Sequence, residues 1–169
     1  MKMFTPNLMV KDLQALPLEA LQAQGIKNLL FDVDNTIVPY NSQGLTQETI
    51  DWFEIPKAMG FAMAILSNNN EERLTPVSEK LGIPFIARSK KPTSNGAKRA
   101  MKLLNAKAET TALVGDQLIT DILCGNRMGF YTIVVEPINK NELWITRFNR
   151  NFERMIYRSI ARRQRRDQT

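Results

Sequence analysis

The sequence contains no histidine and only one cysteine, Cys124. Without histidine the chain cannot form a Ser-His-Asp triad, a His-ligated metal site or an imidazole acid or base. A single cysteine excludes an intramolecular disulfide and is typical of a reducing compartment. Any catalysis must therefore use carboxylates, hydroxyls, lysine and a metal ion.

Long apolar runs are missing as well. No stretch approaches the roughly 18 apolar residues that a membrane span needs, and the N-terminus lacks the apolar segment of a signal peptide. The contents of 43% hydrophobic and 24% charged residues are those of a globular protein. The 169 residues suffice for one domain with a sizeable core. We expect a single domain over residues 1–169 and a cytoplasmic location.

Positive charge is concentrated near the C-terminus. Residues 147–166 contain eight arginines and one acidic residue, Glu153, so the net charge of +6 arises from this segment. On a helical wheel, residues from about 141 to 161 place apolar side chains opposite Arg147, Arg150, Arg154 and Arg158. This stripe either packs on the domain or lies as a basic amphipathic helix on an anionic membrane, at its inner face. The same arginines would also bind RNA non-specifically.

Strand and helix patterns alternate along the rest of the chain. We predict strands at about 26–31, 61–66, 84–87, 111–114 and 131–135. We predict helices at about 18–24, 94–104 and 118–127. A further helix starts near residue 46 and is expected to kink or end at Pro56. Another is expected to run to residue 81, with Thr75 as its N-cap and Pro76 at N1. This order predicts a three-layer, Rossmann-like α/β fold with about five parallel strands flanked by helices, and a core over about 26–137.

Two carboxylates, Asp32 and Asp34, directly follow the first predicted strand. In open α/β sheets, ligands bind beyond the carboxyl ends of the strands. Strand side chains alternate, so both carboxylates would lie on one side of the chain. Two carboxylates this close repel each other unless a proton or cation lies between them. A hard divalent ion such as Mg²⁺, which prefers oxygen ligands, would relieve that repulsion.

Three further polar clusters follow later strands: Ser67 with Asn68, the basic Lys90-Lys91-Pro92 segment, and Asp116 with Asp121. Each cluster alone is an ordinary turn or a solvated surface. Together, in this order and after successive strands, they indicate one site at one edge of the sheet.

The four clusters resemble the motifs of the haloacid dehalogenase (HAD) superfamily phosphatases: Asp-x-Asp-x-Thr, Ser-Asn, Lys-Pro and Gly-Asp-x-x-x-x-Asp. The context Gly25 to Thr36 and the string Gly115-Asp116-Gln117-Leu118-x-Thr120-Asp121 are similar to the YqeG-type branch of subfamily IIIA. That branch is similar to the phosphatidylglycerophosphate phosphatases of mitochondria and plastids.

The resemblance implies a role for each motif residue. Asp32 would attack phosphorus and form an aspartyl-phosphate, and Asp34 would act as general acid and then base. Mg²⁺ would be held by the Asp32 carboxylate, the Asp34 backbone carbonyl and Asp116, with Asp121 as a direct or water-mediated partner. The Ser67 hydroxyl, the Asn68 backbone N–H and the Lys91 ammonium would hold the phosphoryl group. The second acid lies five residues after Asp116, whereas other branches use three or four, which leaves the exact role of Asp121 open.

The spacing of the motifs leaves no room for a cap domain. Residues 36–67 accommodate a turn, a helix and a strand, and residues 67–91 a helix and a short strand. An open site suits a phosphate that projects from something large, so the expected substrate is phosphatidylglycerophosphate. Two alternatives remain: an oligomeric phosphatase of a soluble sugar phosphate, and an RNA- or ribosome-binding protein with residual phosphatase activity.

Overall fold

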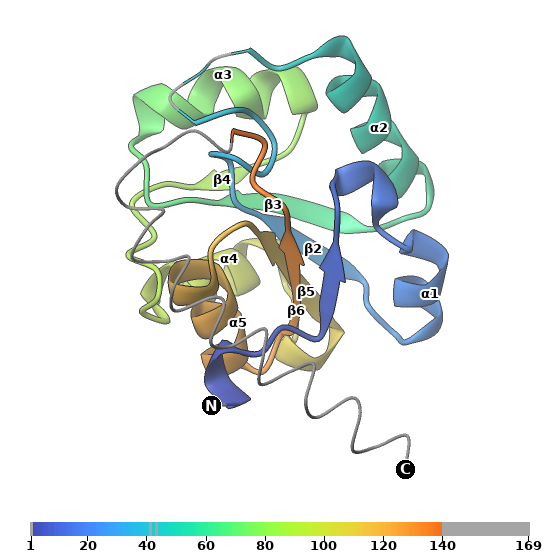
Figure 1. Cartoon of the computed structure of the whole chain (residues 1–169), viewed down its shortest axis with the longest axis vertical. Coiled ribbons are helices and arrows are strands. Elements are labelled where there is room, and N and C mark those ends of the chain that lie inside the picture. Colours follow the sequence, from blue (N-terminus) through green and yellow to red (C-terminus); the bar gives the residue numbers. More distant parts are fainter. Residues whose placement is uncertain (1, 41, 43, 140–169) are drawn as a thin grey trace.

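A computed structural model describes residues 2–40, 42 and 44–139 of the chain (Figure 1). The predicted amphipathic helix at 141–161 and the arginine tail lie outside these described residues. Within them, no helix is long and apolar enough to cross a bilayer.

The centre of the fold is a parallel sheet of six strands in the order β1-β6-β5-β2-β3-β4. The strands are β1 (Leu8–Val10), β2 (Asn28–Phe31), β3 (Ala62–Leu66), β4 (Phe85–Ile86), β5 (Thr111–Gly115) and β6 (Tyr131–Val135). The five predicted strands correspond to β2–β6. The sheet has one strand more than predicted because β1, only three residues long, pairs with the edge of β6.

Five α-helices connect the strands: α1 (Leu18–Ala23), α2 (Gln47–Ala58), α3 (Glu71–Leu81), α4 (Asn95–Leu104) and α5 (Leu123–Met128). A π-helix, Leu118–Ile122, leads into α5, so the single helix predicted at 118–127 has two parts. Short 3-10 helices occupy Lys2–Phe4, Leu13–Ala15 and Ala108–Thr110. Pro56 lies inside α2, which ends at Ala58.

The start of α3 differs from the prediction. The helix begins at Glu71, because the Asn70 side chain caps it by accepting a hydrogen bond from Arg73 N at 3.0 Å. Thr75 and Pro76, predicted as N-cap and N1, lie within the helix, where Pro76 removes one backbone hydrogen bond. Thr75 Oγ1 instead donates to the Glu71 carbonyl at 2.8 Å. This earlier start brings Arg73 into the first turn.

The helices form two layers around the sheet (Figure 1). Leu29 and Phe31 of β2 point to one face and pack with α1, α2 and α3, whereas Leu30 points to the other and packs with α4 and α5. This alternation is the period-two pattern of a strand that is buried on both faces. Phe31, Trp52 and Phe53 stack edge-to-face in the first layer, directly beneath the end of β2. The structure confirms the three-layer α/β prediction.

The spaces between the motifs contain no cap among the described residues. Between Thr36 and Ser67 these residues form α2 and β3, and between Ser67 and Lys91 they form α3 and β4. Consequently the carboxyl edge of the sheet is not covered by an inserted domain in the part of the chain that the structure describes.

Candidate functional site

Three neighbouring strands end at the same edge of the sheet, and each is followed by a polar motif residue. Asp32 follows β2, Ser67 follows β3, and Asp116 follows β5. Because β2 lies between β3 and β5 in parallel register, these residues meet at the carboxyl edge. The order of the strands in the sheet therefore brings residues that are far apart in the sequence together in one site.

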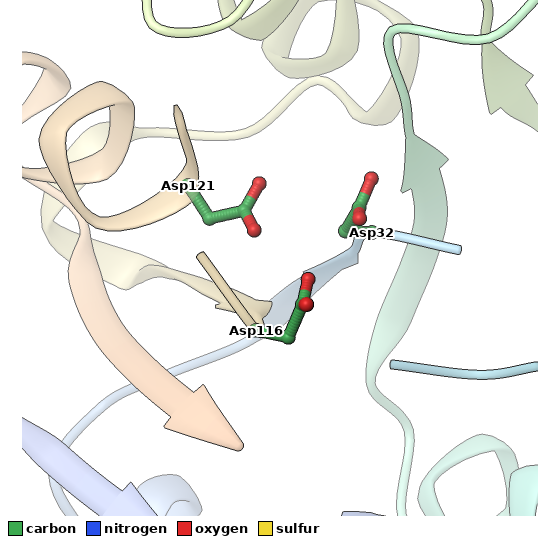
Figure 2. Close-up of side chains that lie close together, drawn as sticks. All are labelled: Asp32, Asp116 and Asp121. Carbon is green, nitrogen blue, oxygen red and sulfur yellow. The ribbon is translucent and has the colours of Figure 1, made fainter. Parts of the chain in front are cut away.

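The carboxylates of Asp32, Asp116 and Asp121 converge from β2, β5 and the π-helix (Figure 2). One oxygen of each lies within 4.8 Å of the others, and all three residues are buried. Asp121 approaches closely because residue 115 is glycine: a Cβ there would lie 2.3 Å from Asp121 Cγ. Asp121 Oδ2 also accepts a hydrogen bond from Gln117 N at 3.1 Å.

Lys91 is the cation within this cluster. Its Nζ donates to Asp32 Oδ1 at 2.7 Å, to Asp121 Oδ1 at 2.6 Å and to the Leu66 carbonyl at 2.7 Å. An ammonium has three donors, so the protein itself occupies all of them. Lys91 thereby joins the ends of β2 and β3 to the π-helix that follows β5.

The charges of the cluster are not balanced among the residues that the structure describes. Burial raises the pKa of Asp32 to about 6, with a further rise from the charge of Asp121 and an opposing effect from Lys91. Burial and the charges of Asp121 and Asp32 raise the pKa of Asp116 well above its usual value. Burial alone would lower the pKa of Lys91, but the two carboxylates that it contacts raise it. Within the described part of the chain, one cation, Lys91, faces three buried carboxylates, so the cluster is short of positive charge.

A hard divalent cation fits this donor set. Asp116 Oδ1 is buried and has no hydrogen-bond partner in the described part of the chain, although buried polar atoms are nearly always paired. Carboxylate oxygens are the ligands that Mg²⁺ prefers. The free oxygen of Asp116 and the nearby oxygens of Asp32 and Asp121 could hold such an ion.

Asp34 lies beside the cluster and has its own partners. Arg73 Nη2 donates to Asp34 Oδ1 at 2.8 Å, and Asn69 Nδ2 donates to Asp34 Oδ2. The side chains of Asp34 and Arg73 are each 14% exposed, so the pair is mostly buried but still reaches solvent. The next residue, Asn35, has a φ of 59° and accepts backbone hydrogen bonds from Tyr40 and Asn139 at its side chain.

Ser67 and Asn68 lie where the sequence predicts them, at the end of β3, but the Asn68 side chain also makes three hydrogen bonds to the loop after β4. Ser67 is buried, and its Oγ accepts a hydrogen bond from Asn69 N at 3.3 Å. Asn68 Oδ1 accepts hydrogen bonds from Lys91 N and Ser89 Oγ, both at 2.7 Å, and Asn68 Nδ2 donates to the Lys91 carbonyl at 3.1 Å. Asn68 thus fixes the backbone from which Lys91 reaches into the site.

Sequence reasoning missed Arg73 and Asn69. Both depend on where α3 begins, and the predicted start at Thr75–Pro76 left Arg73 in a loop. The signal that would have found them is Asn70 followed by Glu71 and Glu72, an N-cap with acidic residues in the first helical turn.

The chain matches a family model described as mitochondrial PGP phosphatase over residues 1–139. It is 41% identical over 162 residues to probable phosphatase YqeG of Bacillus subtilis (strain 168), covering 96% of this chain and 94% of that protein. It is 29% identical over 146 residues to phosphatidylglycerophosphate phosphatase 1, chloroplastic/mitochondrial, of Arabidopsis thaliana, covering 81% of this chain and 42% of that protein. The chain thus spans less than half of the length of the plant relative.

Solved structures share the fold. An uncharacterized protein from Listeria monocytogenes serotype 4b superposes with a TM-score of 0.57 and 21% identity, covering 70% of this chain and 85% of that one. The cobalt-bound deoxy-D-mannose-octulosonate 8-phosphate phosphatase of Haemophilus influenzae gives 0.52 and 20%, covering 66% and 69%. These neighbours share the fold, and the family match together with the Bacillus relative confirms the resemblance that the four motifs predicted.

Proposed function

Because this chain belongs to the mitochondrial PGP phosphatase family and is an HAD-type phosphatase, we propose that it hydrolyses a phosphomonoester through a phosphorylated Asp32. The observation that carries the proposal is the position of Asp32. Its carboxylate is 2.7 Å from Lys91 Nζ and is grouped with Asp116 and Asp121 at the carboxyl edge of the sheet. A carboxylate so placed is a nucleophile surrounded by groups that can neutralise the charge of a phosphate.

In the first step, an Asp32 oxygen bonds to phosphorus as the bond from phosphorus to the alcohol oxygen breaks. Asp34 gives its proton to that oxygen, which leaves as the neutral alcohol. In the second step, water attacks the phosphorus of the aspartyl-phosphate and gives a proton to Asp34. The bond from phosphorus to Asp32 breaks, releasing inorganic phosphate and restoring both carboxyl groups.

The three buried carboxylates would hold Mg²⁺, together with the Asp34 backbone carbonyl. When bound, the ion supplies positive charge that reduces the repulsion between the Asp32 carboxylate and the phosphate dianion. Asp116 would be a direct ligand, since one of its oxygens has no other partner in the described chain. Both oxygens of Asp121 already accept hydrogen bonds, one from Lys91 and one from Gln117 N. Asp121 would therefore position Lys91 as well as contribute to the metal site.

The phosphoryl oxygens would be held by donors at the ends of β3 and β4. The Ser67 hydroxyl and the Asn68 backbone N–H lie at the end of β3, and Lys91 supplies positive charge from the loop after β4. The Asn68 side chain holds that loop in place. Positioning and charge neutralisation are the main contributions that phosphoryl transfer requires of a protein.

The proposed substrate is phosphatidylglycerophosphate. The family description and the plant relative support this choice, and the described chain carries no cap that would enclose a small metabolite. We further propose a cytoplasmic enzyme that contacts the inner face of the membrane through the basic segment at 141–169. Eight arginines between residues 147 and 166 would attract an anionic lipid surface.

The test is phosphate release from phosphatidylglycerophosphate in mixed micelles with Mg²⁺, beside a panel of soluble phosphomonoesters. We expect fast release from the lipid, slow release from the panel, and none after chelation or in Asp32→Asn. Asp51→Asn, which changes an exposed carboxylate on α2, is the matched control. Substantial turnover by Asp32→Asn would disprove the proposal that Asp32 is the nucleophile. Fast release only from a soluble ester would disprove the proposal that the substrate is the lipid.

A further inference from the structure

Two cations contact the carboxylates of the site in the described residues, and they differ in their unused hydrogen-bonding capacity. Lys91 uses all three of its donors within the protein. Arg73 has five donors, and only its Nη2 is hydrogen-bonded to a described residue, Asp34. Arg73 Nη1 is buried without any partner there. A buried charged donor without an acceptor is costly, so Arg73, although paired with Asp34 through Nη2, has donor capacity at Nη1 for a further anionic acceptor.

The position of Arg73 determines where that further acceptor would come from. Arg73 is bonded to Asp34, whose proposed role is to protonate the oxygen of the departing alcohol. Arg73 therefore lies on the side of the site where the alcohol part of the substrate is bound. Lys91, in contrast, contacts Asp32 and lies on the side of the phosphoryl group that is transferred.

We propose that Arg73 forms a subsite for a second anionic group, a phosphodiester or phosphate carried by the departing alcohol. This inference rests on the proposed function and refines it by specifying the class of alcohol. A guanidinium binds phosphate oxygens through paired N–H donors. Phosphatidylglycerophosphate has such an alcohol, since its glycerol carries a phosphodiester. A simple sugar phosphate releases an uncharged alcohol and would provide no anionic acceptor for Arg73 Nη1.

The subsite also accounts for the second bond to Asp34. Asn69 Nδ2 holds Asp34 Oδ2 independently of Arg73, and Asn69 N contacts Ser67 Oγ. Asp34 would therefore stay in place when a ligand draws Arg73 toward itself. This arrangement separates the two functions: Asn69 positions the acid, and Arg73 recognises the alcohol.

The test compares two water-soluble esters, so that membrane binding plays no part. Glycerophosphoglycerophosphate, the deacylated lipid, has an anionic departing alcohol, whereas glycerol 3-phosphate has a neutral one. We expect the wild type to prefer the first in kcat/KM, and Arg73→Met to lower that value about 10- to 100-fold, as for a lost charged hydrogen bond. The value for glycerol 3-phosphate should fall several-fold less. Arg73→Lys should recover part of the preference, and Lys80→Met, on the exposed last turn of α3, should leave both values unchanged.

Equal losses on the two esters in Arg73→Met would overturn the inference and reduce Arg73 to a residue that positions Asp34. The absence of any wild-type preference would overturn it too. A pronounced loss confined to the anionic alcohol would support it, whatever the absolute rates.

A binding experiment keeps the inference testable if no ester is hydrolysed and the proposed function fails. Glycerophosphoglycerol, the alcohol product, should bind the wild type and Asp32→Asn in calorimetry, and binding should be lost in Arg73→Met. Binding that survives in Arg73→Met, or no binding to the wild type, would refute the subsite. Glycerol is the neutral control and should not bind.

Discussion

Replacing Asp32 with asparagine should stabilise the metal-free protein while abolishing its activity. Asp32 is 8% exposed and shares its site with two other buried carboxylates. Burial, with the charge of Asp121, raises its pKa from 3.8 to about 6 despite the attraction of Lys91. Asparagine has nearly the same shape as the protonated acid and still accepts from Lys91, but it never carries the buried charge.

The magnitude follows from the pKa of Asp32. A rise from 3.8 to about 6, at 1.36 kcal/mol per unit, disfavours the ionised folded state by about 3 kcal/mol. Well below pH 3.8 the acid is protonated in both states and costs nothing. As pH rises from 3.8 to 6 the folded state binds more protons than the unfolded state, so stability falls, and above pH 6 the full cost applies.

The assay is urea unfolding in the presence of a chelator at pH 4, 5 and 7.5. Asp32→Asn should exceed the wild type by about 0.5 kcal/mol at pH 4, gain about half of the full difference at pH 5, and reach about 3 kcal/mol at pH 7.5. For a chain of this length that gain corresponds to a rise of about 6–12 °C in Tm. The exposed-site control Asp51→Asn should stay within about 0.5 kcal/mol of the wild type throughout. An Asp32→Asn protein no more stable than the wild type at pH 7.5 would refute the reasoning.

Three further changes test the site. Mg²⁺ at 100 times its Kd should stabilise the wild type by about 2.7 kcal/mol in urea unfolding; equal stabilisation of Asp116→Asn would argue against Asp116 as a ligand. Lys91→Met leaves Asp32 and Asp121 buried without their cation and should cost about 3–5 kcal/mol at neutral pH, part of which Lys91→Met/Asp121→Asn should recover; a neutral single change would contradict the ion pairs. Gly115→Ala places a methyl group 2.3 Å from Asp121 Cγ and should displace that carboxylate. The protein should keep a native circular dichroism spectrum, while kcat/KM should fall at least about 10-fold, as typically follows a lost positioning contact. Unchanged turnover would show that Asp121 need not hold its position.

Most of the sheet was predictable because β2, β3, β5 and β6 are apolar runs that end at polar residues. β1 was not, since Leu8–Val10 has only three residues and owes its strand conformation to pairing with β6. The start of α3 was wrong because a Thr-Pro pair is a common helix start, whereas the Asn70 cap stabilises an earlier one.

The candidate site was predictable to the extent that its residues follow strands directly. Asp32, Ser67 and Asp116 do so, and the sheet order brings them together. The environment of Asp34 was not predictable, since Arg73 approaches it from a helix 39 residues away in the chain. The sequence also did not predict that all three ammonium donors of Lys91 are hydrogen-bonded within the protein, because two of the acceptors are a β3 carbonyl and Asp121 of the π-helix.

The three hydrogen bonds that Lys91 Nζ donates have an evolutionary consequence. Its ammonium has a structural role at the carboxyl edge of the sheet in addition to its proposed role in catalysis, because it is hydrogen-bonded to Asp32, Asp121 and the Leu66 carbonyl. Losing Lys91 alone would leave buried anions, and losing Asp121 alone would leave a buried cation with one acceptor fewer. A descendant of this fold that no longer needed catalysis would therefore be expected to lose both residues together, so their joint absence would mark a former enzyme.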